Sequence, residues 1–339
     1  MNRQDSRYTT FALCREMLDT VEVIRRFDTA RTADVANAIA DAGRLMLIGE
    51  GSSRIFPARN MIRKALTRGA KLQVVTDGSR QAATYDLTEF AVFAASNSGR
   101  TKEVVTLIQR LRAAGNDRCY GLTANEGTLL AEHAAATFVL SCGWEQAVAA
   151  TKSVAEQALF YQSILDHCTE APAEPFGRAA DAVATALSMP IDRQVVDLAA
   201  RAGTIYFAGY NDGVAEELTL KTNEITRRKS DFLEGTYAVH GIEEVMDADD
   251  VVFVVEPIEE ELPKFKEVLV DGVGLTVVAI ATHPTDLPTI QVPEAGELTP
   301  FVYLAAGWNL LVETGLGLGI DLDKPTRARK VGNEFVTPQ

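Results

Sequence analysis

The sequence predicts an α/β protein built from two copies of one unit, each a parallel sheet flanked by helices. Three apolar, strand-like runs of the first half recur in the second half. The pairs are 45–48 and 205–208, 91–94 and 251–254, and 120–122 and 277–280. The first two pairs are displaced by 160 positions and the third by 157. Helix-period stretches, such as 101–113 and 214–227, lie between the runs, and this alternation is typical of a parallel sheet covered on both faces.

The same patterns predict the domain boundaries. Residues 1–43 are expected to form an N-terminal helical arm that packs on the core, because apolar residues recur there at three- or four-residue steps. The first copy is expected at 44–170 and the second at 176–320, followed by a tail at 321–339. The linker between the copies is expected within His167 to Pro175, which is rich in proline and small residues.

The segment from Ser96 to Thr101, Ser-Asn-Ser-Gly-Arg-Thr, lies where a predicted strand ends and a predicted helix begins. Backbone N–H groups of a helix N-terminus and side-chain hydroxyls converge at such a point, which suits a phosphate. A single Ser, Thr or Asn there would be explained as a helix cap. This loop has four such residues, Ser96, Asn97, Ser98 and Thr101, and the excess indicates an anion site. Gly51-Ser52-Ser53 follows the preceding strand and is expected at the same sheet edge.

Composition and charge argue against several classes of protein. The formal net charge of −14 and the pI near 4.9 do not fit a general nucleic-acid surface, which needs a basic patch. No apolar run approaches the roughly 20 residues of a membrane span. The N-terminus has no apolar region followed by a small-residue cleavage site, so we expect a cytoplasmic protein.

The sequence motifs give little support to a metal ion or a nucleotide cofactor. The four cysteines have no CxxC spacing and are expected to be buried free thiols, and the four histidines do not cluster with them. Residues 49–54 begin like a dinucleotide fingerprint but lack its third glycine. We therefore expect neither a metal ion nor a cofactor.

The second copy differs from the first where the anion loop would lie. The same displacement reaches 257–261, whose glutamates would repel a phosphate. The second copy instead has Lys221 and Glu224, three residues apart on one predicted helix face, and His240 further along. From the residues alone, a surface ion pair and a structural histidine are favoured over catalytic groups.

These motifs together resemble the sugar isomerase (SIS) domain family. The resemblance rests on 51–53, 96–101 and 145–152 in the first copy and extends over roughly 10–335. The whole chain is similar to the double-SIS isomerase half of glucosamine-6-phosphate synthase and to stand-alone phosphosugar isomerases, deaminases and deglycases. The resemblance implies two SIS domains, each a flavodoxin-like sandwich.

The resemblance also implies roles for individual residues. Glu224 is implied as the general base, with Lys221 beside it, His240 as the ring-opening group and Lys330 as the lysine of a closing tail. In this family the histidine reaches the site from the neighbouring subunit, so a homodimer is implied. The implied substrate-binding residues are Gly51, Ser52, Ser53, Ser96, Asn97, Ser98, Thr101 and Val148.

The activity implied by the resemblance is that of a phosphosugar isomerase or deaminase acting on a 6-phosphorylated sugar or amino sugar. Ring opening is followed by proton transfer between C2 and C1, with or without ammonia release. A fructosamine-6-phosphate deglycase and a non-catalytic phosphosugar sensor are the alternatives. The chain departs from the family at Asn97 and Arg100, at Ala150, and where 242–244 follow the His-Gly pair. Because it begins Met1-Asn2-Arg3, without a cysteine-led glutaminase domain, synthase activity is not expected.

Overall fold

The structure is a computed structural model that describes residues 1–172 and 175–336. The chain divides into two compact units that interleave along the sequence. One, here called the loop unit because it holds the loop from Ser96 to Thr101, comprises 22–145, 150–174 and 327–339. The other, the lysine unit, holds Lys221 and comprises 1–21, 146–149 and 175–326.

The predicted arm of residues 1–43 is thus divided between the two units. It contains α1 (Ser6–Thr9), α2 (Ala12–Arg25), a 3-10 turn η1 (Thr29–Thr32) and α3 (Ala33–Ala42). Residues 173–174 of the predicted linker and 337–339 of the predicted tail lie outside the described residues.

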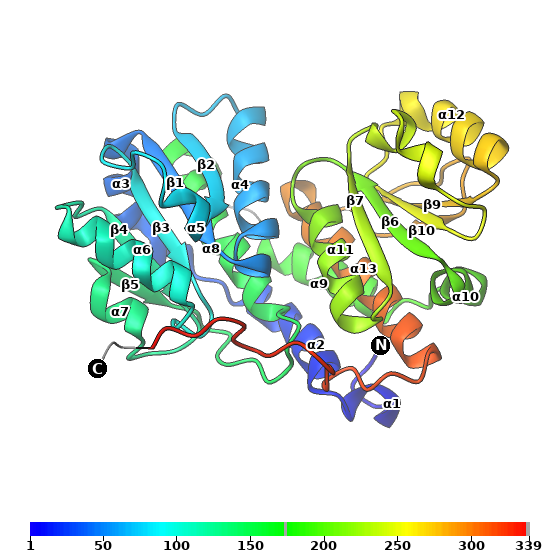
Figure 1. Ribbon diagram of the computed structural model, residues 1–339, viewed down its shortest axis with the longest axis horizontal. Coiled ribbons are helices and arrows are strands. Elements are labelled where there is room, and N and C mark those ends of the chain that lie inside the picture. Colours follow the sequence, from blue (N-terminus) through cyan, green and yellow to red (C-terminus); the bar gives the residue numbers. More distant parts are fainter. Residues whose placement is uncertain (173–174, 337–339) are drawn as a thin grey trace. The chain divides into compact units, whose positions relative to one another are not determined.

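The loop unit contains a five-stranded parallel sheet (Figure 1). Its strands are β1 (Arg44–Gly49), β2 (Gln73–Gly78), β3 (Ala91–Ala95), β4 (Cys119–Thr123) and β5 (Ala136–Val139). They lie in the order β2-β1-β3-β4-β5, and every neighbouring pair is parallel. All five residues of β3 are buried, as expected for a central strand whose two faces are both covered.

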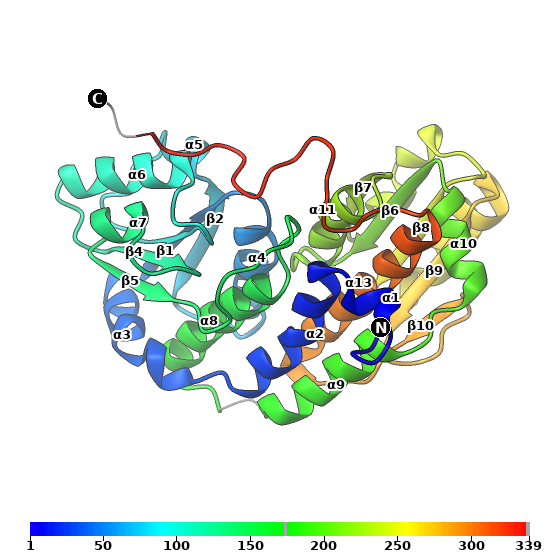
Figure 2. The same ribbon diagram turned by 90° about the horizontal axis from the view of Figure 1, so that it is seen from below.

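Helices cover both faces of this sheet. They are α3, α4 (Ile55–Thr67), α5 (Ser79–Ala82), α6 (Lys102–Ala113), α7 (Leu129–His133) and α8 (Lys152–Thr169). Figure 2 shows α6 and α7 on one face and α3 and α8 on the other. Under α8, the ring of Phe93 on β3 lies with its centroid 5.7 Å from Phe160 and 5.5 Å from Tyr161. This aromatic packing fixes α8 against the strand that leads into the loop from Ser96 to Thr101.

The lysine unit repeats the same sheet. Its strands are β6 (Thr204–Gly209), β7 (Lys229–Glu234), β8 (Val251–Val255), β9 (Thr276–Ala281) and β10 (Thr289–Gln291). The order β10-β9-β8-β6-β7, read from the β7 end, matches that of the first sheet, with β6 in the place of β1 and β8 in the place of β3. All neighbours are again parallel. The predicted α/β fold with a repeated parallel sheet is confirmed.

The helices of the lysine unit include α9 (Phe176–Ser188), α10 (Arg193–Arg201), α11 (Val214–Ile225), α12 (Leu262–Phe265), a π-helix η6 (Lys266–Val273) and α13 (Thr299–Gly317). Short 3-10 turns are η3 (Tyr237–Val239), η4 (Ile242–Val245), η5 (Glu259–Glu261) and η7 (Gly296–Leu298). The buried helix α13 packs against α9, α10 and α11. A Cβ on Gly307 of α13 would lie 2.3 Å from Leu218 of α11, so the glycine allows α11, which carries Lys221, to pack closely. Within residues 1–172 and 175–336, no helix is long and apolar enough to cross a membrane.

Candidate functional site

The loop between β3 and α6 brings three hydroxyl groups together. Ser96 Oγ lies 2.9 Å from Thr101 Oγ1 and 3.5 Å from Ser98 Oγ. The backbone N–H of Arg100 donates to Ser98 Oγ at 3.2 Å, which orients that side chain. Thr101 occupies the N-cap position of α6, yet its side chain caps none of the described backbone N–H groups. The three hydroxyls form a polar cluster at a helix N-terminus, the arrangement that suits an anion.

The side chain of Asn97 is used differently from those of the adjacent serines. Its Nδ2 lies 2.6 Å from Ser153 Oγ and 3.5 Å from Glu145 Oε2, and its Oδ1 accepts from Gln157 Nε2 at 2.7 Å. Ser153 and Gln157 lie on α8 and are fully buried, and Glu145 is 2% exposed. The amide of Asn97 is therefore held by the protein interior. Glu145 and Gln157 were not predicted as site residues, because nothing local in the sequence links them to the loop.

A second turn of small residues follows the neighbouring strand. Gly51 to Ser53 form the 3-10 turn η2 directly after β1, and Ser52 is buried there. Because β1 pairs with β3 in parallel, η2 and the Ser96 loop follow the same ends of adjacent strands. The strand order reverses between β1 and β3, and in open parallel sheets ligands bind at such a point.

The C-terminal tail lies against the Ser96 loop. Thr101 and Glu334 form an isolated antiparallel bridge. The backbone N–H of Lys102 donates to the Asn333 carbonyl at 3.0 Å, and the N–H of Phe335 donates to the Arg100 carbonyl at 2.8 Å. The tail therefore pairs with the loop mainly through backbone groups.

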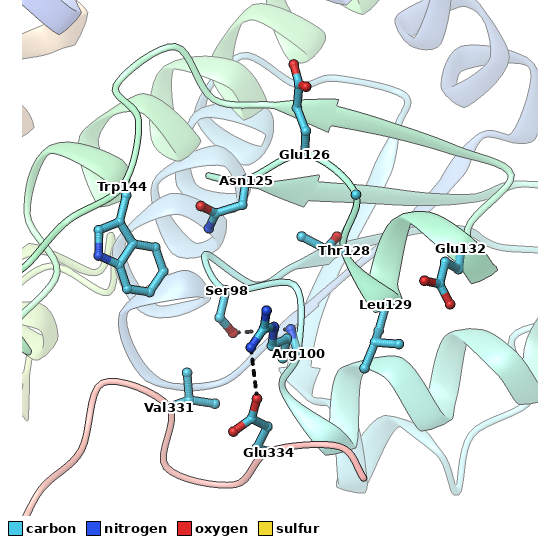
Figure 3. A pocket seen from close by; sticks show the side chains of 11 residues that line it. Ser98, Arg100, Asn125, Glu126, Thr128, Leu129, Glu132, Trp144, Val331 and Glu334 are labelled. Atoms are coloured by element: carbon cyan, nitrogen blue, oxygen red, sulfur yellow. Dashed lines mark hydrogen bonds and ion pairs between the residues drawn. The ribbon is translucent and has the colours of Figure 1, made fainter. Parts of the chain in front are cut away.

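Beside this contact is a cavity of about 630 Å³, whose lining side chains appear in Figure 3. Its lining includes Ser98, Arg100, Trp144 and Glu334, and the guanidinium of Arg100 forms an ion pair of 3.3 Å with Glu334. The ammonium of Lys330 lies 5.8 Å from the centre of the Trp144 ring, a cation–π contact. Lys330 is thus placed in the loop unit, close to the indole that borders the cavity.

The lysine unit holds a buried charge cluster on α11. Lys221 Nζ lies 2.7 Å from Glu224 Oε2 and 3.2 Å from Glu217 Oε1. The side chains of Lys221 and Glu217 are fully buried, whereas that of Glu224 is 24% exposed. Burial alone would lower the pKa of Lys221, but the attraction of Glu224 and then Glu217 outweighs it, so the pKa lies above the ordinary value. An ammonium that is charged at neutral pH therefore holds a partly exposed carboxylate in place. Glu217 was not predicted, although its spacing of four from Lys221 was visible in the sequence.

His240 ends the 3-10 turn η3, in the segment that follows β7, and is exposed. Gly241 follows with a φ of +109°, and its N–H donates to the Glu243 carboxylate at 2.6 Å. Val148, also in the lysine unit, is partly exposed, and next to it Ala147 donates its N–H to Glu16 Oε2 at 3.2 Å.

The structure thus brings Ser96, Ser98 and Thr101 together in the loop unit and Lys221 and Glu224 together in the lysine unit. Among the described residues, His, Cys, Asp and Glu side chains form no group of three or more that could hold a metal ion. The four cysteines are free; Cys14 and Cys119 are buried, and Cys142 and Cys168 are partly buried.

Comparison with protein families identifies the class of the first copy. Residues 38–165 match the family described as the SIS domain, and these residues include β1 to β5, η2 and the Ser96 loop. The likeness to a SIS domain thus covers the first of the two repeated sheets.

Individual relatives extend the likeness to the rest of the chain. The chain is 28% identical over 331 residues to the isomerizing glutamine–fructose-6-phosphate aminotransferase of Aeropyrum pernix, a match that covers 87% of this chain. It spans about half, 52%, of that relative's length. The glucosamine-6-phosphate deaminase of Thermotoga maritima has the same fold, with a TM-score of 0.76, 21% identity and coverage of 96% of this chain and 99% of that one. The tagatose-6-phosphate ketose/aldose isomerase of Escherichia coli gives a TM-score of 0.75, 18% identity and coverage of 96% and 99%.

Proposed function

We propose that this protein is an enzyme acting on a 6-phosphorylated sugar, either interconverting aldose and ketose or releasing ammonia from a 2-amino sugar phosphate. The observation that carries the proposal is Glu224, a partly exposed carboxylate 2.7 Å from a fully buried ammonium. A hydroxyl loop alone would serve a phosphosugar sensor equally well. A fixed, accessible carboxylate is what proton transfer at carbon requires in addition.

In the proposed reaction the Ser96 loop holds the phosphate and so fixes the reacting carbons, which is the positioning contribution to the rate. His240 moves a proton between O5 and O1 to open the ring. Glu224 then removes the proton from C2, giving an enediol, and returns it to C1. With a 2-amino sugar the same transfer gives an imine at C2, which water hydrolyses to the ketose phosphate and ammonia.

The two lysines take separate parts in this proposal. Lys221 is fully buried and orients Glu224. Lys330, on the tail, is the cation proposed to stabilise the oxygen on which negative charge develops in the enediolate. Both parts are electrostatic, since neither lysine forms a bond to the substrate.

The proposal includes a homodimer in which His240 of one copy serves the site of the other. The exposure of His240, together with the exposed ring of Tyr237 on the preceding turn, supports a role at a subunit contact. A mixture of inactive Glu224→Gln and inactive His240→Ala proteins would then recover activity after subunit exchange. Sedimentation of the native protein as a monomer would contradict this part of the proposal.

The test of the function is hydrogen exchange at C2. The protein is incubated in D₂O with hexose 6-phosphates, 2-amino-hexose 6-phosphates and a fructosamine 6-phosphate, and proton NMR follows the signal of the exchangeable proton, at C2 in the aldoses and at C1 in the ketose and the fructosamine. Loss of that signal supports enediol or enamine chemistry, and an ammonium assay separates deaminase from isomerase. Turnover of the fructosamine alone would identify a deglycase. Binding of a sugar phosphate without any exchange would contradict the proposal of an enzyme and favour a non-catalytic phosphosugar sensor.

A further inference from the structure

The Ser96 loop is connected to the protein interior through one side chain, that of Asn97. Both of its polar atoms are engaged there, Nδ2 by Ser153 and Glu145 and Oδ1 by Gln157. The backbone carbonyl of Asn97 is held as well, since Asn125 Nδ2 donates to it at 2.8 Å. The residue between the two serines of the loop is therefore fixed on several sides.

The hydrogen bonds that run inward from Asn97 end at the buried carboxylate of Glu145. One oxygen, Oε1, accepts the backbone N–H of Thr151 at 2.7 Å and its hydroxyl at 3.1 Å. The other, Oε2, accepts the hydroxyl of Ser153. Glu145 also lies at the N-terminus of α8, where a negative charge is favoured. At 2% exposure, the carboxylate is compensated by these donors.

The carboxylate sets the direction of the hydrogen bonds that lead to the loop. An ionised carboxylate can only accept, so the Ser153 hydroxyl donates to Glu145 and its oxygen accepts from Asn97. Asn97 must then present its NH₂ group to Ser153 and its oxygen to Gln157. Only one orientation of the Asn97 amide satisfies this chain, and the loop carrying Ser96 and Ser98 is thereby held in one conformation.

We infer that Glu145 is a positioning residue for the anion loop, acting through Ser153 and Asn97, and that Asn97 serves the loop as its anchor more than as a direct ligand. The inference rests on the proposed function, because it takes the Ser96 loop to be the phosphate site. Hydroxyls and N–H groups that are already oriented bind an anion without first being ordered, which is the advantage of a site supported from behind.

The test compares phosphate binding by two variants that each lose one buried carboxylate. Glutamine at position 145 has one acceptor oxygen for two sets of donors. In either orientation of its amide, the NH₂ group therefore faces another donor and cannot form a hydrogen bond with it. We expect Glu145→Gln to weaken the binding of inorganic phosphate, measured by titration calorimetry, about tenfold. The matched control is Glu156→Gln. Like Glu145, Glu156 is buried, and it lies on α8. Its carboxylate accepts hydrogen bonds from Ser141 and Cys142 and pairs with Arg31, instead of contacting the residues that lead to the loop.

The control separates positioning from a general loss of stability. Both variants are expected to lower the unfolding midpoint, but Glu156→Gln should bind phosphate within about twofold of the wild type. In the exchange assay, Glu145→Gln should raise the half-saturating sugar phosphate concentration more than it lowers the rate at saturation, because the loop is affected and the base is not. If Glu145→Gln does not fold, Ser153→Ala breaks the same connection with a smaller change and should also weaken phosphate binding.

The outcomes distinguish this inference from the function on which it rests. Weakened binding in Glu145→Gln or Ser153→Ala, together with a normal Glu156→Gln, supports it. Wild-type phosphate affinity in Glu145→Gln and Ser153→Ala overturns the inference and leaves the anion site intact. Equally weakened phosphate binding in Glu156→Gln has the same meaning. Absence of phosphate binding by the wild-type protein overturns the anion site itself and the inference with it.

Discussion

Gly99 and Thr128 lie so close together that no side chain fits between them. A Cβ built on Gly99 would be 2.3 Å from Thr128 Cβ, and Gly99 has a φ of +61°. Thr128 cannot move aside freely, because its hydroxyl accepts the Ala131 N–H at the start of α7. The carbonyl of Gly99 also accepts the N–H of Leu130 at 3.0 Å. The loops that follow β3 and β4 are therefore fixed to each other at this glycine.

Gly99→Ala is expected to lower the free energy of unfolding by about 3 kcal/mol, because strain at positive φ is added to a steric clash. Gly127→Ala is the matched control. It has a φ of +60° in the adjacent loop, and no described atom lies within 4 Å of a Cβ built there. The control should cost only about 1 kcal/mol in urea unfolding. Equal losses in the two variants would show that Thr128 yields to the new methyl group.

Glu224→Gln tests the base. The amide keeps the size of the side chain but cannot take a proton from carbon, so exchange at C2 should fall by about 100-fold to 10,000-fold while sugar phosphate binding remains. Glu260→Gln, which changes an exposed glutamate of the same unit, should exchange at the wild-type rate. Normal exchange in Glu224→Gln would remove this residue as the base.

Replacing Lys221 should damage stability as well as activity. In Lys221→Met the fully buried carboxylate of Glu217 and that of Glu224 lose their shared cation. Removing one partner of a buried ion pair costs about 3–5 kcal/mol. Chemical unfolding of the variant and the wild type measures the difference. A variant as stable as the wild type would mean that Glu217 takes up a proton at little cost.

The raised pKa of Lys221 also predicts a pH dependence. When the pKa is higher in the folded than in the unfolded state, the stabilisation is fully present below the unfolded value, about 10.4 for lysine. It is lost as the pH rises through the folded value. Wild-type stability should therefore fall at strongly alkaline pH, and a shallower fall is expected in Lys221→Met. Parallel curves for the two proteins would contradict the assignment.

The ion pair between Arg100 and Glu334 should matter little for stability. Their side chains are 61% and 51% exposed, and exposed pairs contribute about 0–1 kcal/mol. A double-mutant cycle with Arg100→Ala and Glu334→Ala should give a coupling energy within that range, reduced by salt. A larger coupling would mean that the side chains, and not the backbone pairing of 333–335, hold the tail on the loop.

The cysteines are expected to react slowly in the folded protein. Burial raises the pKa of Cys14 to about 12 and the pKa values of Cys119 and Cys168 to about 11. Burial, and then Glu156, raise the pKa of Cys142 as well. Since the thiolate is the reactive form, labelling at pH 8 should be more than about a hundredfold slower in native than in denatured protein. A rapidly labelled native thiol would identify an opening near it.

Three of the five strands in each sheet were predictable because buried parallel strands are short, nearly continuous apolar runs. The runs 45–48 and 91–94 lie within β1 and β3, and the hydroxyl loop begins where β3 ends. These are local properties, and a displacement of 160 positions between two similar patterns needs no knowledge of contacts. The spacing of Lys221 and Glu224 likewise follows from the helical period.

The contacts that give the site residues their roles were not predictable in the same way. An asparagine in this loop could serve either as a phosphate ligand or as an anchor to the protein interior. The contact of Asn97 with Glu145, 48 residues later, distinguishes the two roles. Pairing of Asn333 and Phe335 with the loop joins parts of the chain more than 230 residues apart and leaves no periodic signal. The close packing of α13 on α11 depends on the contact of Gly307 with Leu218, which joins residues far apart in the sequence.

The strand order shared by the two sheets has a consequence for how this chain tolerates sequence change. Where the first copy has the hydroxyl loop after β3, the second has Pro257 to Glu261 after β8, with three consecutive glutamates in η5. A fold present twice within one polypeptide allows the two copies to carry different loops at equivalent positions. Selection then acts on the two halves separately, so substitutions that are lethal at one position can be neutral at its structural counterpart.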